Sequence, residues 1–468
     1  MIETYMAEQD KTELFETMPI GRALSKLAVP TVLSSLVMII YNLADTYFVG
    51  MLNDPVQNSA VTLAAPVLLS FSAVTNLFGI GSSSMMSRAL GLKDYDTVRK
   101  SSALGFYGAL LAAFLYSLIF FIFRHPILNL LGADATTYAP TASYLIWTCG
   151  FGAIPAILNV VLSYLVRAEG SALAAGLGTM SGCFLNIILD PFFILPAYLD
   201  MGAAGAGLAT LISNLAACVF FFLFLAVKKE KTYVSIKPEH LKAGRRLIRG
   251  IFAVGVPAAV QNLLNVTGMT VLNNFTSAYG TTALAGMGIA AKIDKVAFFI
   301  ALGTAQGMMP LVGYNFAAKN EKRMREAIRV TMAAALVFLS AMTVFYLTAA
   351  RGIIRFFMKD SDVIAWGSRY LKGLSLALPF LGIDFIGVGV FQACGMGKNS
   401  LLFAVLRKII LEIPALIILN HFFPPYGIAY AQFAAELILA AAAGIVLHEL
   451  LKRIRRAQAE RENKRAER

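Results

Sequence analysis

Carboxylic acids lie inside long apolar stretches of the sequence, where a charge is costly. These six acids are Asp45, Asp190, Asp294, Asp384, Glu412 and Glu436. An acidic group at the centre of a membrane-spanning helix costs roughly 2.5–3.5 kcal/mol, so such groups are retained mainly for function. A carboxylate in this setting binds a cation or carries a proton. The sequence therefore indicates ion-linked chemistry.

Two of these acids have polar partners one helical turn away. Tyr41 precedes Asp45 by four residues, and Asn186 precedes Asp190 by four, so each pair shares a helix face. Pro191 has no N–H and leaves one carbonyl of the preceding turn without its helical partner. Such a break is tolerated where the backbone lines a cavity. The alternative is that Asn186 and Asp190 only cap or join helices.

Thr210, in the next apolar stretch, completes a set of hard oxygen donors with Asp45, Asn186 and Asp190. Such donors suit Na⁺ better than a soft transition metal. Two neighbouring carboxylates also suit a proton carrier, because each disfavours ionisation of the other. The residues leave H⁺ and Na⁺ both open. They predict no cofactor and no metal beyond Na⁺ at these four residues.

The acids of the second half of the chain have less defined roles. Asp294 lies between Lys292 and Lys295, and we interpret it as a local ion pair or a helix-end residue. The other three are candidates for a site in the second half or in a substrate cavity: Asp384, Glu412 and Glu436.

The elements that carry these residues are predicted to be membrane-spanning helices. The chain is 58% hydrophobic and 14% charged, whereas soluble domains carry about 25% charged residues. A span needs roughly 20 apolar residues. We expect twelve spans, near 27–50, 59–87, 101–123, 138–166, 171–195, 203–227, 250–276, 283–314, 327–350, 365–394, 400–420 and 427–450. The predicted fold class is all-α, a polytopic membrane protein of two pseudo-symmetric six-helix lobes.

Basic residues gather in the tails and in alternate loops. The segment 228–249 holds eight Lys and Arg residues, and the tail from 452 to 468 holds another eight. The positive-inside rule then places both termini in the cytoplasm of a bacterial cell, and it explains the net charge of +13 without a nucleic-acid partner. The expected parts are a cytoplasmic tail (1–26), an N-lobe (27–227), a cytoplasmic linker (228–249), a C-lobe (250–450) and a basic cytoplasmic tail (451–468).

The two lobes repeat each other in sequence. Pro30 is matched by Pro257, Met85-Met86 by Met308-Met309, and Pro191 by Pro414, always at an offset of 223 to 227 residues. Six spans per lobe give both lobes the same orientation, so they form parallel repeats of the kind that transporters use. The linker would let the lobes rock.

Other classes of protein are poorly supported by the sequence. The segment Gly395-Met396-Gly397-Lys398-Asn399 lacks the glycine spacing and the Ser/Thr of a nucleotide-binding loop. No buried Ser/His pair or metal-binding cluster emerges, so we expect no enzyme.

The chain resembles the multidrug and toxic compound extrusion (MATE) family over nearly its whole length, and three short sequence runs carry the resemblance. They are Tyr41-Asn42-Leu43-Ala44-Asp45, Leu165-Val166-Arg167-Ala168-Glu169-Gly170, and Asn186 with Asp190-Pro191. The run Phe391-Gln392-Ala393-Cys394-Gly395 looks like the branch of DinF and MepA-like pumps. The resemblance implies a V-shaped pair of lobes and an N-lobe cation site formed by Asp45, Asn186, Asp190 and Thr210, with Tyr41 close by. Asp384 departs by about one helical turn from the acid that another branch uses in its C-lobe.

The expected function is export of organic cationic or lipophilic drugs in exchange for H⁺ or Na⁺, by a monomer in the inner membrane. The first alternative is a flippase for lipid-linked saccharides from the same superfamily, which would need a more cationic cavity for the pyrophosphate. The second alternative is a channel. Midspan carboxylates in a two-fold repeat suit alternating access better than an open pore.

Overall fold

A computed structural model describes residues 12–242 and 244–466, and in these ranges it contains helices and no strands. The predicted all-α class is confirmed. In a bilayer a backbone must satisfy its own hydrogen bonds, which leaves the helix as the element available to long apolar segments. Large apolar side chains remain on the outside: the exposed fraction is 53% for Phe114 and 73% for Val337. Such a surface fits lipid.

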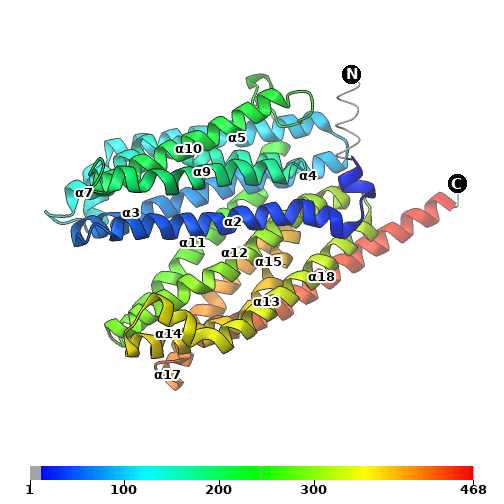
Figure 1. Cartoon of the computed structure of the whole chain (residues 1–468). Helices are drawn as coiled ribbons and strands as arrows, with labels where there is room; N and C mark the ends of the chain where they lie inside the picture. The colour runs from blue at the N-terminus through cyan, green and yellow to red at the C-terminus, as the bar shows by residue number, and fades with distance from the viewer. Residues whose placement is uncertain (1–11, 243, 467–468) are drawn as a thin grey trace. The chain divides into compact units, whose positions relative to one another are not determined.

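The first half of the chain forms six helical passages (Figure 1). They are α2 (Ile20–Gly50); α3 (Pro55–Thr75) with η2 (Asn76–Ile80) and α4 (Gly81–Gly91); α5 (Tyr95–Ile122); α7 (Tyr138–Leu145) with η3 (Ile146–Phe151) and α8 (Ala153–Ala168); α9 (Ala172–Ile194); and α10 (Gly202–Val227). Short elements lie at or between them: η1 (Glu13–Thr17), α6 (Arg124–Leu130) and η4 (Pro238–Leu241).

The second half forms six more (Figure 1). They are α11 (Arg245–Ser277); α12 (Thr281–Ala317); α13 (Glu321–Phe357); α14 (Ser361–Ser375) with α15 (Leu378–Ala393); α16 (Gly397–Val405) with η5 (Leu406–Glu412) and α17 (Ile413–Phe422); and α18 (Gly427–Ala466). Short polar side chains start several of these helices. Asp54, Asp94, Asn320 and Asp360 each accept a hydrogen bond from a backbone N–H of the first turn.

Nine helices of the described chain are long and apolar enough to cross a membrane, and two bent pairs bring the number to eleven. The bends follow Phe151 and Ser375, measure 49° and 45°, and fall in the fourth span of each predicted lobe. The remaining expected span, 400–420, is the eleventh in chain order and is helical throughout α16, η5 and α17. It carries three charged residues close together, which makes it less apolar than the others: Arg407, Lys408 and Glu412.

The chain divides into two compact units. Unit 1 contains Leu33–Ala259, and unit 2 contains Phe15–Val32 together with the chain from Val260 onward. In unit 1, α9 packs against α10, and α8 packs against both. In unit 2, α12 packs against α13, α14 and α15, while α18 packs against α15 and α17. The lobe limits 27–227 and 250–450 remain predictions.

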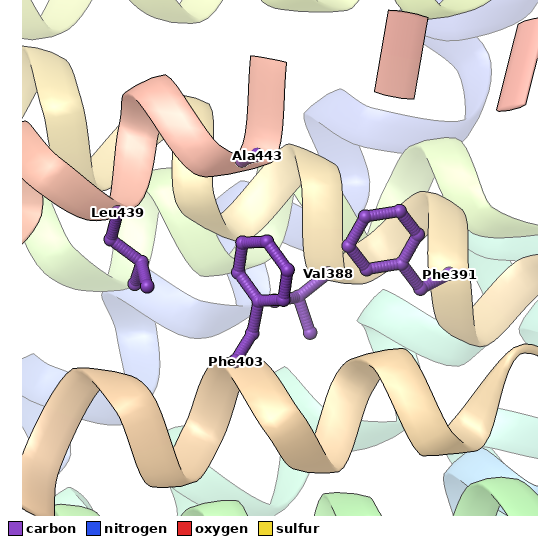
Figure 2. Close-up of a cluster of buried hydrophobic side chains, with 5 residues drawn as sticks. All are labelled: Val388, Phe391, Phe403, Leu439 and Ala443. Carbon is purple, nitrogen blue, oxygen red and sulfur yellow. The ribbon is translucent and has the colours of Figure 1, made fainter. Parts of the chain in front are cut away.

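An apolar cluster joins three helices of unit 2. Val388 and Phe391 come from α15, Phe403 from α16, and Leu439 with Ala443 from α18 (Figure 2). The Phe391 and Phe403 ring centroids lie 5.3 Å apart. Close packing of this kind fixes the mutual register of the helices. It therefore helps to hold the polar residues of α15 and α18, one or two turns away, at defined positions.

Candidate functional site

The predicted N-lobe residues come from three helices of unit 1. Tyr41 and Asp45 lie on α2, Asn186 and Asp190 on α9, and Thr210 on α10. The four-residue spacings put each pair on one helix face, as predicted. Pro191 lies inside α9 directly after Asp190 and removes one backbone donor from the helix there.

Glycines bring α9 and α10 close together beside these residues. A Cβ atom on Gly182 would lie 3.0 Å from the carbonyl oxygen of Ser213, and one on Gly178 would lie 2.5 Å from the Phe221 ring. Small residues allow such close approach between membrane helices. Asn186 lies one turn beyond Gly182, so this approach sets it opposite Thr210.

The structure brings the predicted residues into contact. The Asn186 amide Nδ2 lies 3.4 Å from Thr210 Oγ1. Tyr41 lies beside Thr210 and close enough to Asp45 and Asp190 to interact with both carboxylates. The Asp190 side chain is fully buried, and Asn186 is 1% exposed.

Four oxygen atoms of this group are buried without a hydrogen-bond donor in the described part of the chain. They are both carboxylate oxygens of Asp190, Oδ1 of Asp45 and the amide oxygen of Asn186. A buried acceptor without a partner is costly, and a buried carboxylate without one more so. The group is thus arranged as an incomplete oxygen cage, which a proton or a small hard cation would complete.

A sixth residue of the site is Tyr144 on α7, which was not among the site residues predicted from the sequence. It is buried and interacts with Tyr41, Asp45 and Asp190. We call the six residues the N-lobe cluster: Tyr41, Asp45, Tyr144, Asn186, Asp190 and Thr210.

A second polar layer supports Thr210 and was also missed. Asn159 Nδ2 of α8 donates to Asn214 Oδ1 of α10 at 2.6 Å. Asn214 Nδ2 in turn donates to the Thr210 carbonyl at 2.9 Å. The signal that could have found these residues is an asparagine in an apolar helix, because a buried amide needs partners.

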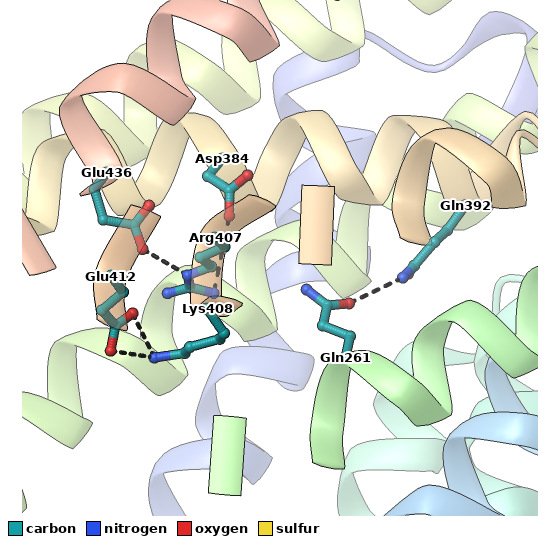
Figure 3. Close-up of polar contacts among 7 residues, drawn as sticks. All are labelled: Gln261, Asp384, Gln392, Arg407, Lys408, Glu412 and Glu436. Carbon is teal, nitrogen blue, oxygen red and sulfur yellow. Dashed lines mark hydrogen bonds and ion pairs between the residues drawn. The ribbon is translucent and has the colours of Figure 1, made fainter. Parts of the chain in front are cut away.

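In unit 2 the structure gathers the remaining candidates around one arginine (Figure 3). Arg407 Nε lies 2.6 Å from Glu436 Oε1, and Arg407 Nη1 lies 3.8 Å from Asp384 Oδ2. Lys408 Nζ, on the same π-helical segment η5, binds Glu412 at 2.6 Å. We call these five residues the C-lobe cluster: Asp384, Arg407, Lys408, Glu412 and Glu436.

Asp294 belongs to neither cluster. It is buried in the interior of α12, and no ion pair to Lys292 or Lys295 is present in the described chain, so neither the expected local ion pair nor the expected helix-end position is found. The nearby Tyr346 hydroxyl donates to the carbonyl of Ile293 at 3.0 Å.

The same family model, MatE, matches the chain twice, over residues 30–192 and 257–418. The protein belongs to the MATE family. The two matches begin 227 residues apart, which agrees with the repeat offset found in the sequence. The predicted family resemblance, carried by the residues around Asp45 and Asp190, is therefore confirmed.

Similar proteins match this MATE protein along nearly its whole length. The multidrug export protein MepA of Staphylococcus aureus (strain MSSA476) is 32% identical over 443 residues, which are 94% of this chain and 96% of MepA. MepA of Staphylococcus haemolyticus (strain JCSC1435) is also 32% identical over 94% of the chain and 96% of its own length.

Solved structures show the same fold. A crystal structure of MATE in complex with MaL6 has a TM-score of 0.89 at 23% identity and covers 95% of this chain and 99% of its own. An outward-facing multidrug resistance MATE transporter of the MOP superfamily has a TM-score of 0.86 at 24% identity, and it covers 95% of this chain and 98% of its own. The fold of these MATE structures is thus the fold of this chain.

Proposed function

We propose that the protein is a secondary active antiporter that exports organic cationic or lipophilic drugs in exchange for H⁺ or Na⁺. The observation that carries this proposal is the group of four buried oxygens without donors in the N-lobe cluster. In a protein with two lobes of parallel repeats, such a group is suited to take up an ion on one side of the membrane and release it on the other.

The ion provides both energy and a switch. Each elementary charge that moves inward gains about 2.3 kcal/mol per 100 mV of membrane potential. Each bound cation cancels one of the two negative charges of Asp45 and Asp190, whose carboxylates otherwise repel each other in a site of low dielectric constant. The helices that carry them, α2 and α9, both contain a proline, and a proline-interrupted helix can bend when its surroundings change.

The cargo follows from charge and from the relatives. The six residues of the N-lobe cluster include two acids and no Lys or Arg, which favours cationic over anionic cargo. Tyr41 and Tyr144 add aromatic faces that suit flat cations. MepA, at 32% identity, is a multidrug export protein, and its name supports drugs as the substrate class here. The same acidic character argues against the pyrophosphate of a lipid-linked saccharide.

The proposal is tested with the purified protein in proteoliposomes that contain an ethidium-like dye. A pH gradient and a Na⁺ gradient are imposed separately at the same membrane potential. We expect one of the two to drive dye transport against its gradient, and the other to leave it at the level of protein-free vesicles. Dye transport that neither gradient changes would contradict coupled exchange, and accumulation that needs ATP would contradict a secondary transporter.

The proposed topology has its own test. Both termini and the 228–249 linker are expected on the cytoplasmic side, with the Asp200 loop outside. An impermeant thiol reagent applied to intact cells should label Asp200→Cys and leave Lys229→Cys unlabelled. The four native cysteines are buried, so the background should be low. Permeabilised cells serve as the control in which both positions react; the reverse pattern in intact cells would show that the orientation is wrong.

A further inference from the structure

The end of α13 that leads into α14 carries a group of exposed basic residues. Arg351 and Arg355 lie one turn apart in the last two turns of α13, and Lys359 follows in the connection to α14. None of the three forms an ion pair among the described residues. We call these three residues the basic stripe.

The acids of the same connection are engaged with α14. Asp360 accepts hydrogen bonds from the backbone N–H groups of Asp362 and Val363, both at 2.9 Å, and Asp362 lies in the first turn of α14. Carboxylates at this position complement the positive end of the helix dipole. The segment 351–372 holds five Lys and Arg residues against these two acids, a net charge of +3. The basic stripe is therefore not balanced by its own connection.

Two ordinary reasons for basic residues do not account for the stripe. The positive-inside rule gathers such residues at the cytoplasmic end, whereas α14 lies at the end of unit 2 opposite to the last turns of α18 (Figure 1). The helix dipole favours a basic residue in the last turn, which is Arg355, but Arg351 lies one turn earlier and repels it. An anion bound between these side chains would relieve the repulsion.

The repeat shows that the stripe is particular to the second half. At the offset of 227 that relates Pro30 to Pro257, the segment 351–372 corresponds to 124–145. The Lys, Arg, Asp and Glu residues of 124–145 are Arg124 and Asp134, so its net charge is zero. A helical repeat of this kind does not require the extra charges, which points to a partner of the second half alone.

Apolar surface adjoins the stripe. Phe356 and Phe357 lie within it and are 86% and 55% exposed. Earlier along α13, Val344 and Phe345 are 60% and 52% exposed, as expected for side chains that face lipid. A partner that covers both surfaces must therefore combine negative charge with long apolar chains.

We propose that the basic stripe binds an anionic phospholipid, whose phosphodiester pairs with the stripe while its acyl chains lie along α13. Guanidinium groups bind phosphate oxygens through two parallel hydrogen bonds, and a lysine adds a point charge. A zwitterionic lipid fits less well, because its own cationic group competes with the stripe for the phosphate. The proposal is independent of drug export, since it involves neither the N-lobe cluster nor a coupling ion. The topology decides only which leaflet supplies the lipid.

The test uses the two tryptophans of the chain as reporters. Trp366 of α14 precedes Gly367, and a Cβ atom on Gly367 would lie 3.1 Å from Ile354 of α13, so Trp366 lies beside the last turns of α13. Trp147 lies in η3 of unit 1 and serves as the reference. The full-length protein with Trp147→Phe, or with Trp366→Phe, is placed in phosphatidylcholine nanodiscs. A small fraction of the lipid is phosphatidylglycerol or phosphatidylcholine with brominated chains, which quench tryptophan fluorescence at short range.

We expect brominated phosphatidylglycerol to quench Trp366 at a lower mole fraction than brominated phosphatidylcholine, and the two lipids to quench Trp147 alike. This preference should fall about fivefold for each basic residue of the stripe that is changed to glutamine. It should be lost in the triple variant Arg351→Gln, Arg355→Gln, Lys359→Gln. It should also disappear at about 1 M salt, where charges are screened within a few ångströms.

Matched variants separate the stripe from the net charge. Lys228→Gln with Lys229→Gln and Lys231→Gln removes the same three charges from the exposed linker and should keep the preference of Trp366 for phosphatidylglycerol. The proposal is overturned if both lipids quench Trp366 alike, if the triple variant of the stripe keeps the preference, or if the linker variant loses it equally. It is also overturned if free glycerol phosphate, at the concentration of the brominated lipid, restores the fluorescence, because the partner would then be a soluble anion. If the triple variant of the stripe does not purify as a folded protein, the salt titration decides, and a preference that persists at high salt contradicts the proposal.

Discussion

Asp190→Asn is expected to abolish coupled drug export while leaving the protein folded. The amide has nearly the shape of the carboxylate but carries no charge, so the site resembles its ion-loaded form at all times. Only Asp45 is then left to respond to the ion, so ion binding no longer changes the charge at Asp190 on α9 and the gradient is uncoupled from that helix. Gradient-driven dye transport in proteoliposomes should fall to the level of protein-free vesicles.

Folding should not suffer, because both oxygens of Asp190 are buried without a donor. Replacing an unpartnered acid by a neutral amide removes part of that cost. Thermal unfolding in detergent should therefore begin at a temperature no lower than that of the unsubstituted protein.

Asp200→Asn is the matched control for this variant. Asp200 lies in the exposed turn between α9 and α10 and has a φ of +50°, a conformation that Asn tolerates well. The Asp200→Asn variant should export dye at the rate of the unsubstituted protein. Export at the full rate in Asp190→Asn would show that Asp190 is not the coupling residue.

The spans were predictable because their signal is local. A run of apolar residues crosses a bilayer whatever its neighbours are, and eleven of the twelve expected stretches coincide with spans or bent spans. The bends were not predicted. They depend on where a helix loses its regular hydrogen bonds, as near the π-helical segment η3.

The sequence indicated different shares of the residues in the N-lobe cluster and the C-lobe cluster. Asp45 and Asp190 were found because a carboxylate stands out in an apolar helix. Tyr144 was missed because an aromatic residue there is ordinary packing material until its neighbours are known. Glu412 could have been paired with Lys408 from the four-residue spacing alone.

Arg407 was the hardest residue to interpret from sequence. It adjoins Lys408, and two adjacent basic residues in a span give no sign that they face different acids. The segment η5 is a π-helix, which has more residues per turn than an α-helix and shifts the faces that follow. The pairing of Arg407 on η5 with Glu436 on α18 joins two different helices, so it exists only in the folded unit.

Arg407→Gln is expected to lower the free energy of unfolding by about 3–5 kcal/mol, because it removes the cation from a buried group of charges. Lys100→Gln is the matched control: Lys100 pairs with Asp96 on a surface where the two side chains are 32% and 64% exposed, and the expected loss is below about 1 kcal/mol. Both are measured by denaturant titration in the same detergent. An equal loss in the two variants would show that Arg407 is not needed as a counter-charge.

The pH dependence of this loss of stability shows whether it is caused by the missing charge of Arg407 or by its missing packing. Without Arg407, Asp384 and Glu436 are both buried and uncompensated, so the folded protein must bind protons that the unfolded chain does not need. When the folded state binds more protons, stability rises as pH falls. The loss in the free energy of unfolding that Arg407→Gln causes should therefore be smaller at acidic pH and larger at alkaline pH. In Arg407→Gln with Glu436→Gln one acid is already neutral, so the deficit should be smaller and should depend less on pH. A deficit that is constant across pH would mean that Arg407 acts through its packing on Phe385 and not through its charge.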